Sequence, residues 1–384
     1  MTVGFIHHYG LGDNILAFRA LYECKRFYRC RLIVFGNALM MRLLQCCSFV
    51  DKIIDIHVLD KESALTIKKY HCDYLILTNP KSSYISDLRI CQTTIITGTK
   101  IPSLFSSYCK TVPIFLLPQY RKMNVAEILC VLVRKINPTV YDAEKTKLEN
   151  LINNPHLQQA DSKECLTDTL PYSSINYKIQ TSEEHQTSIS AFLQKAFHAA
   201  CSPFYLIAIN PFCIAAQYSL PSLAWLELID RVSQIPSCKV LVVTYPTVHE
   251  EFIQDIKHFD TKSTITNGSI KQSKNILLNR ITLFQNNYDV LNLAEILSRV
   301  SLLISPSTGA IHLASNLRIP SIGLYSHKDT RKWATYDRRY VIINKPKEEL
   351  DSRECHHIIS ETLHTLESLI ASSSLTQYAD NQRR

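Results

Sequence analysis

SLLISPSTGAIHLASNLRIPSIGLYS, residues 301–326, contains a complete strand–turn–helix–strand unit. An apolar run ends at Ser305, and a Pro-Ser-Thr-Gly turn leads into a stretch, 308–317, whose apolar spacing predicts a helix. The next apolar run, 320–326, predicts a second strand. Strands that alternate with helices in this way are typical of a parallel sheet covered on both faces.

The same alternation continues on both sides of this segment. Further strands are predicted at 3–7, 31–36, 52–56, 74–77, 94–97, 204–210 and 239–245. Helices are predicted at 14–28, 38–47, 125–136, 188–200, 223–232, 250–258, 291–299 and 358–370. The chain is therefore expected to be an α/β protein with two series of strands.

A polar stretch separates the two series. Residues from about 141 to 201 are rich in Asn, Gln, Ser, Thr, Lys and Glu, which suggests a crossing between domains. At roughly 150 residues per domain, 384 residues fit two domains. We expect an N-terminal domain at 1–190 that includes most of the polar stretch, a second domain at 201–350, and a C-terminal helix with a frayed tail at 351–384.

The composition sets limits on the environment and the partners. Hydrophobic residues make up 46%, which is enough for a sizeable core. The net charge of +8 fits an acidic substrate, an anionic membrane surface or nucleic acid, and it equally fits a plain solvated surface. The 13 cysteines include no C-x-x-C pair, which favours thiols in a reducing compartment. No N-terminal signal is visible, and apolar runs such as 128–133 are too short to span a bilayer.

The first candidate site is GLGDN, residues 10–14, between the first predicted strand and helix. Ligands of open α/β sheets bind at the carboxyl ends of the strands, where this turn lies. Gly10 and Gly12 allow the backbone to approach a ligand, and Asp13 stands at the mouth of the site. The alternative is that Asp13 is only the N-cap of a helix. The dinucleotide pattern G-x-G-x-x-G is absent.

The second candidate site is the turn before the helix at 308–317. Free N–H groups at a helix start can hold a phosphate, and the hydroxyls of Ser307 and Thr308 would assist. His312 lies one turn further on, on the same face as Gly309. The alternative is that Ser307 or Thr308 merely caps the helix and that His312 is an interior histidine.

GLGDNILAFRAL (10–21) and STGAIHLASNLRIPSIGLYS (307–326) together resemble the two signature segments of glycosyltransferase family 9. That is the family of the ADP-heptose:lipopolysaccharide heptosyltransferases. The resemblance implies the GT-B architecture, two Rossmann-like domains with parallel sheets that face each other across a cleft. It also implies that the acceptor binds to the first domain and the nucleotide sugar to the second.

Positions of functional residues follow from the same resemblance. Asp13 matches the catalytic base, with Gly10, Gly12 and Asn14 beside it as substrate-binding residues. Ser307, Thr308, Gly309 and His312 match the segment around the donor diphosphate, and Glu250 matches a residue that contacts the nucleoside. Three positions depart from the family pattern: Tyr218 replaces a Lys, Ser307 replaces an Asp, and Pro246 replaces a Gly.

The expected activity is an inverting, metal-independent transfer of a sugar from a nucleotide-diphosphate donor. ADP-heptose is the expected donor, and lipopolysaccharide or a related glycolipid or oligosaccharide of the cell envelope is the expected acceptor. No cofactor, metal or nucleic acid is expected, since no Asp-x-Asp, H-E-x-x-H or paired Cys/His spacing occurs. The expected location is the cytoplasm, with peripheral contact at the inner membrane.

Two other classes compete with this interpretation. A non-catalytic sugar-nucleotide or glycan-binding protein of the same fold would tolerate the changes at Tyr218 and Ser307, whereas the retained Asp13 argues against it. A Rossmann-type oxidoreductase is disfavoured because the glycine fingerprint is missing.

Overall fold

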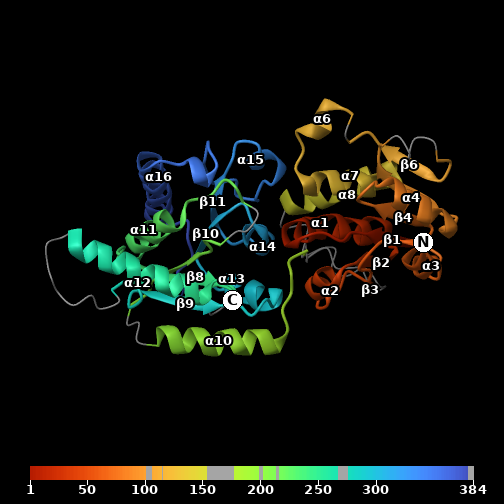
Figure 1. Cartoon of the computed structure of the whole chain (residues 1–384). Helices are drawn as coiled ribbons and strands as arrows, with labels where there is room; N and C mark the ends of the chain where they lie inside the picture. The colour runs from red at the N-terminus through yellow and green to blue at the C-terminus, as the bar shows by residue number, and fades with distance from the viewer. Residues whose placement is uncertain are drawn as a thin grey trace. The chain divides into compact units, whose positions relative to one another are not determined.

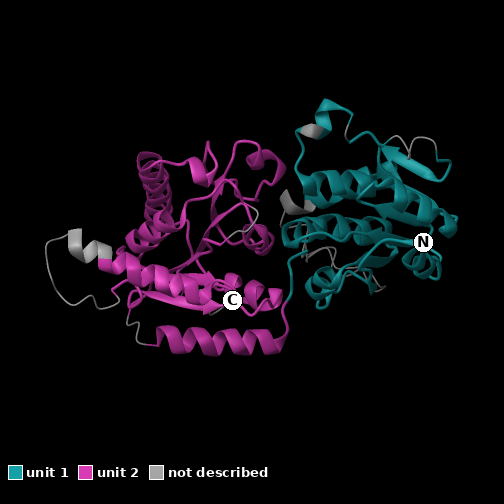
Figure 2. Ribbon diagram, viewed as in Figure 1, with its two compact units in different colours: residues 1–180 teal, residues 181–384 magenta. Residues whose placement is uncertain are grey.

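The computed structural model describes residues 1–100, 106–114, 116–153, 177–198, 202–212, 216–266 and 276–378. The chain divides into two compact units, Met1–Gln180 and Thr181–Arg384 (Figure 2). The division falls directly before a helix at Glu183–Phe197, which therefore belongs wholly to the second unit.

Unit 1 is built on a parallel six-stranded sheet in the order β3-β2-β1-β4-β5-β6 (Figure 1). The strands are β1 (Thr2–Ile6), β2 (Arg31–Gly36), β3 (Lys52–Asp55), β4 (Tyr74–Leu77), β5 (Thr94–Gly98) and β6 (Cys109–Val112). The helices are α1 (Leu11–Tyr28), α2 (Ala38–Leu44), α3 (Lys61–Lys68), α4 (Ser82–Leu88), α6 (Pro118–Arg121), α7 (Val125–Arg134) and α8 (Pro138–Asn153), with a 3-10 turn, η1, at Arg89–Cys91.

Strand β1 lies at the centre of this sheet. Phe5 pairs with Val34 on β2 and with Ile76 on β4, and all three side chains are buried. Such continuous apolar strands are expected where helices cover both faces of a parallel sheet. The strand order reverses between β1 and β4, which is where open α/β sheets form their ligand crevice.

Unit 2 repeats the same winding with the order β12-β11-β10-β7-β8-β9 (Figure 1). Its strands are β7 (Tyr205–Ile209), β8 (Cys238–Thr244), β9 (Ile281–Gln285), β10 (Leu302–Pro306), β11 (Ser321–Tyr325) and β12 (Tyr340–Ile342). Its helices are α10 (Glu183–Phe197), α11 (Ser222–Ser233), α12 (His249–Thr266), α13 (Val290–Ser298), α14 (Gly309–Leu317), α15 (Asp329–Lys332) and α16 (Ser352–Ala371), with a 3-10 turn, η3, at Lys347–Glu349. Here the order reverses between β7 and β10.

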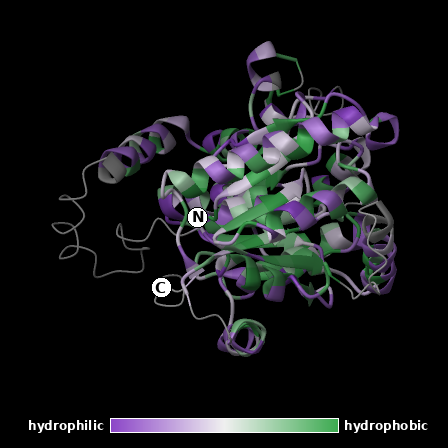
Figure 3. Ribbon diagram, turned by 90° about the vertical axis from the view of Figure 1, so that its left-hand side faces the viewer, coloured by the Kyte–Doolittle hydropathy of each residue, from purple (hydrophilic) through white to green (hydrophobic). Residues whose placement is uncertain are grey.

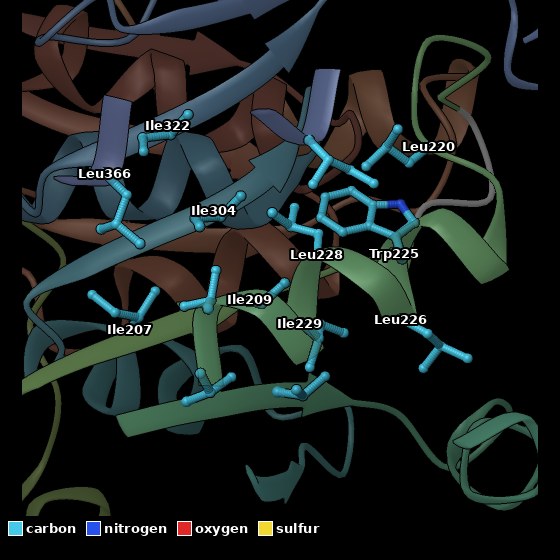
Figure 4. Packing of buried hydrophobic residues seen from close by; sticks show 14 of the residues in the cluster. Ile207, Ile209, Leu220, Trp225, Leu226, Leu228, Ile229, Ile304, Ile322 and Leu366 are labelled. Atoms are coloured by element: carbon cyan, nitrogen blue, oxygen red, sulfur yellow. The ribbon is translucent and has the colours of Figure 1, made fainter. Parts of the chain in front are cut away.

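The core of unit 2 is formed by apolar side chains from the sheet and from helices α11 and α16 (Figure 4). Trp225 lies close to Leu220 and Leu228, and its indole N–H donates to the Ser219 hydroxyl at 3.1 Å. Leu366 brings α16 into the same cluster. Coloured by hydropathy, the strands form the apolar interior, while the helices around them alternate apolar and polar residues (Figure 3).

The expectation of a frayed C-terminal tail after the last helix is wrong as far as Tyr378. The Tyr378 ring stacks on Phe204 at a centroid distance of 4.9 Å, and its backbone N–H donates to the Phe204 carbonyl at 2.9 Å. The polar composition of the tail conceals this aromatic pair, which holds the end of the described chain on unit 2.

The polar stretch after residue 141 begins as a packed helix, not as a crossing. Tyr141 on α8 is buried, and its hydroxyl donates to Glu23 on α1. The other oxygen of Glu23 accepts from Arg19 at 2.8 Å. A few buried side chains in an otherwise polar helix are enough to dock it, and their spacing is a weak signal in the sequence.

Within the described segments, no helix combines the length and apolarity needed to cross a bilayer. The ten cysteines that lie in those segments carry free thiols.

Candidate functional site

The first candidate site lies between β1 and α1 in unit 1. Helix α1 begins at Leu11, three residues earlier than predicted, and its N-cap residue is Gly10. Asp13 is therefore the third residue of the helix and not the cap. A carboxylate in the first turn is favoured by the positive end of the helix dipole. Asp13 is half-buried, so part of it remains open to solvent.

A buried histidine fastens this first turn to the sheet. His7 lies just after β1, and burial lowers its pKa to about 4, so the ring is neutral near pH 7. Its Nε2 lies 3.1 Å from the Asp13 carbonyl oxygen, which can only accept, so Nε2 carries the proton. Nδ1 lies 3.0 Å from the Thr78 hydroxyl oxygen. Since Thr78 follows β4, His7 joins the point of strand reversal to the backbone of Asp13.

Asn14 is completely buried, and its side chain makes hydrogen bonds to neighbouring residues of unit 1. Its Oδ1 accepts from the Tyr9 N–H at 3.2 Å, and its Nδ2 donates to the Tyr9 carbonyl at 3.1 Å. Asn37 donates to the same carbonyl at 3.0 Å. The Asn14 side chain thus fixes the loop that carries Gly10. A Cβ at Gly10 would meet no atom within 4 Å, so the backbone there is open to an approaching group.

The second candidate site lies between β10 and α14 in unit 2. Thr308 is the N-cap residue of α14, yet no side chain among the described residues caps this helix. The Thr308 hydroxyl lies 3.1 Å from the Ser305 hydroxyl instead. The first N–H groups of α14 are thus left for an external acceptor, as at helix starts that bind phosphate.

Sequence reasoning missed Asn210, which lies beside this helix start. Asn210 directly follows β7, the neighbour of β10, and so occupies the point of strand reversal. Its Nδ2 lies 3.5 Å from both the Ser305 and the Thr308 hydroxyls. Its Oδ1 is buried and has no partner in the described structure. The Asn-Pro pair immediately after an apolar run was the available signal.

Ser307 and His312 have different surroundings. The Ser307 hydroxyl bonds to Tyr325, whose own hydroxyl donates to the Trp333 carbonyl at 3.2 Å. Burial lowers the pKa of His312 to about 4, so its ring is neutral near pH 7. Its Nδ1 is buried and has no partner in the described structure. His312 is thus an interior histidine with one unused ring nitrogen.

The remaining predicted residues lie elsewhere in unit 2. Glu250 is exposed in the first turn of α12, after β8. Tyr218 is half-buried and packs against the apolar core cluster. Asn210, Ser305 and Thr308 thus form one hydrogen-bonded group, whereas Glu250 lies on α12 and Tyr218 lies against the core cluster. Asp13 belongs to unit 1.

The chain was compared with protein-family models. Residues 221–361 match glycosyltransferase family 9 (heptosyltransferase). The matched segment includes α14 and the turn before it, whereas GLGDN lies outside it. This match confirms the expected resemblance to the family, and with it the expectation of a glycosyltransferase. A comparison with curated protein sequences gave no match.

Solved structures resemble the whole chain in fold. ADP-heptose lps heptosyltransferase II of E. coli has 11% identity and a TM-score of 0.64, with 97% of this chain and 100% of that chain covered. A family 9 glycosyl transferase from Veillonella parvula has 12% identity and a TM-score of 0.62, with coverage of 89% and 85%. The E. coli heptosyltransferase WaaC with ADP-2-deoxy-2-fluoro heptose has 12% identity and a TM-score of 0.56, with coverage of 95% and 99%. The predicted α/β fold of the GT-B class is thus confirmed.

Proposed function

We propose that this chain, whose residues 221–361 match glycosyltransferase family 9, transfers a sugar from a nucleotide-diphosphate donor to an envelope glycan with inversion. Heptose is the expected sugar, and lipopolysaccharide or a related glycolipid or oligosaccharide is the expected acceptor. The observation that carries the proposal is the uncapped start of α14 beside Asn210, at the point where the strand order reverses.

The leaving group determines what unit 2 must do. Negative charge develops on the diphosphate as the bond to the anomeric carbon breaks, and preorganised donors stabilise it. The N–H groups at the start of α14 and the Thr308 hydroxyl are such donors. Glu250 would accept hydrogen bonds from the nucleoside. The solved structure of WaaC with an ADP-heptose analogue supports this choice of donor.

The attacking hydroxyl determines what unit 1 must do. A base has to accept the acceptor proton while the hydroxyl attacks the anomeric carbon. Asp13 is a half-buried carboxylate at the carboxyl edge of the sheet, held through its backbone by His7. One direct attack on the face opposite the leaving group inverts the anomeric centre. The helix start of α14 supplies the positive field, so the transfer needs no metal.

The test is a transfer assay with ADP-heptose and a lipopolysaccharide-type acceptor, with UDP- and GDP-linked sugars as donor controls. Asp13→Asn should fold normally and lose about 100-fold or more in turnover, because the amide cannot accept the proton. Wild-type activity in EDTA should be unchanged. Activity of Asp13→Asn within a few-fold of wild type would remove Asp13 from the base role, and a metal requirement would contradict the metal-independent step.

A non-catalytic nucleotide-sugar-binding protein is the second candidate. The packing of Tyr218 on the core favours it, because the cation that the family often places there is absent. Such a protein would bind the donor in calorimetry without releasing ADP when any acceptor is added.

We further propose a cytoplasmic location with peripheral membrane contact, because the expected acceptor is anchored in the inner membrane. The segment between residues 88 and 126 of unit 1 supports this. It contains Arg89, Lys100, Lys110, Arg121 and Lys122 and no Asp or Glu.

A further inference from the structure

We propose that Tyr288, supported by Tyr245, is a stacking platform for the base of the nucleotide. The proposal rests on the proposed function of unit 2 and adds the residue that holds the nucleobase. The observation that carries it is an exposed aromatic ring, held by one stacking contact and one hydrogen bond, at the carboxyl edge of the sheet.

Tyr288 is held by two contacts, although it is 61% exposed. Its ring stacks on that of Tyr245, with 6.3 Å between the centroids and 20° between the planes. Its hydroxyl donates to the Thr247 hydroxyl at 3.0 Å. The exposed part of a ring that is fixed in this way can be covered by a planar π-system, which is the chemistry that fits an open aromatic face.

The backbone of Tyr288 adopts a conformation that is unfavourable for a tyrosine. Its φ is 60°, in the left-handed region that glycine and asparagine adopt readily and that a bulky residue adopts at a cost. Backbone strain of this kind concentrates at binding sites. A glycine at this position would relieve the strain, so the fold alone does not explain a tyrosine.

The platform lies on the correct edge of the sheet for a nucleotide whose diphosphate sits at α14. Tyr245 directly follows β8, and Tyr288 lies three residues after β9. The order β10-β7-β8-β9 places these strands two and three positions from β10. At about 4.8 Å per strand the separation is roughly 10–15 Å, which an extended nucleoside diphosphate can bridge. Glu250, in the first turn of the helix that follows β8, would then face the ribose.

Calorimetry on the full chain with two probes, ADP and inorganic pyrophosphate, tests the platform. Tyr288→Ala should weaken ADP binding about tenfold, since stacking on an aromatic side chain contributes about 1–3 kcal/mol per base. Pyrophosphate lacks a base, so its affinity should stay within twofold. Tyr288→Phe keeps the ring and should stay within about threefold of wild type for ADP.

The variant Tyr288→Gly distinguishes an effect on ADP binding from an effect on the stability of the fold. It should melt no lower than Tyr288→Ala, because glycine adopts the backbone at φ 60° without strain. Its ADP affinity should nevertheless fall as far as that of Tyr288→Ala. Unchanged ADP affinity in Tyr288→Ala, or an equal loss for ADP and pyrophosphate, would overturn the platform. If the wild-type protein binds pyrophosphate and no nucleotide, the platform fails and the phosphate site stands; if it binds neither, both fail.

Discussion

The Thr308 hydroxyl can be tested for two roles, binding of a ligand and capping of helix α14. Thr308 occupies the N-cap position of α14, but its side chain makes no cap hydrogen bond and contacts Ser305 instead. Thr308→Val should therefore cost less than the roughly 0.5–2 kcal/mol typical of a lost cap. It should still weaken nucleotide binding several-fold, because one donor to the diphosphate is gone. Urea unfolding and calorimetry on the same preparation measure the two effects.

Asp351→Ala is the matched control for that experiment. Asp351 caps α16 in the same unit, and its Oδ1 accepts from the Glu354 N–H at 2.8 Å. The control should lose about 1 kcal/mol of stability and keep full nucleotide affinity. If Thr308→Val behaves like the control, the hydroxyl serves the fold and not the ligand.

Single residues could be predicted from the sequence only where a motif fixed their neighbours. The Ser-Thr-Gly turn pointed correctly to the start of a helix, because a strand, a turn and a helix leave few alternatives. Asn14 was expected beside a ligand and is instead completely buried. Successive residues of a helix point about 100° apart. When the start of a helix is predicted three residues late, the sequence no longer shows which side chains of its first turn face the core. Asn210 was marked only by the Asn-Pro pair after an apolar run, and it was missed.

At the scale of elements, the loop between β1 and α1 depends on the Asn14 side chain. Asn14→Ala would leave the partly buried Tyr9 N–H without that partner and the Tyr9 carbonyl with its bond from Asn37, which should cost about 1–3 kcal/mol in urea unfolding. Turnover should fall as well, because Asp13 is carried by the same turn. Asn14→Asp keeps an acceptor for the Tyr9 N–H but places a carboxylate at a completely buried position that faces the Tyr9 carbonyl, so a loss at least as large as that of Asn14→Ala is expected. Equal stability of all three proteins would show that the loop does not need this side chain.

Central strands were predicted well, whereas of the four edge strands only β3, expected at 52–56, was predicted. The runs that became β1, β2, β4, β7, β8, β10 and β11 are apolar enough to be recognised. The strands β6, β9 and β12 lie at or next to the solvent at sheet edges and were missed. An edge strand buries only part of its surface, so CKTV at Cys109–Val112 needs few apolar residues. A strand that is buried on both faces is recognised by a run of apolar residues, and this run is interrupted where the strand is only partly buried.

At the scale of the whole molecule, each unit contains a buried neutral histidine, and both should make folding sensitive to acid. The pKa of His7 and that of His312 are lowered to about 4, whereas an unfolded histidine has a pKa near 6.5. Between these values the unfolded chain binds more protons, so stability is present at pH 7 and is lost as pH falls from about 6.5 to 4. Each histidine should contribute a loss of about 2 kcal/mol by pH 5.

Urea unfolding at pH 7 and at pH 5 measures this loss. His7→Gln and His312→Gln should each flatten the dependence on pH, even if the variant is less stable at pH 7. A pH dependence unchanged in both variants would assign the acid sensitivity to other groups.

The charge distribution over the molecule leads to the last prediction. The acid-free segment of unit 1, residues 88–126, includes a turn after β6 that exposes Leu116 by 61% and Leu117 by 41%. The Pro113 carbonyl accepts from the N–H groups of both leucines at 3.1 Å. It leads into α6, which stands away from α7 in Figure 1. Apolar side chains among cations are suited to an anionic bilayer surface.

Flotation with vesicles tests this contact. The wild-type protein should bind vesicles that contain phosphatidylglycerol and should bind neutral phosphatidylcholine vesicles much more weakly, with a loss of binding at high salt. The double variant Leu116→Ser/Leu117→Ser should bind at least tenfold more weakly. Val58→Ser/Leu65→Ser is the matched control, because these side chains are 61% and 48% exposed in the same unit but lie near Asp55, Asp60 and Glu62. Equal binding of both double variants would place the membrane contact elsewhere, and no binding of the wild type to either vesicle would refute peripheral contact.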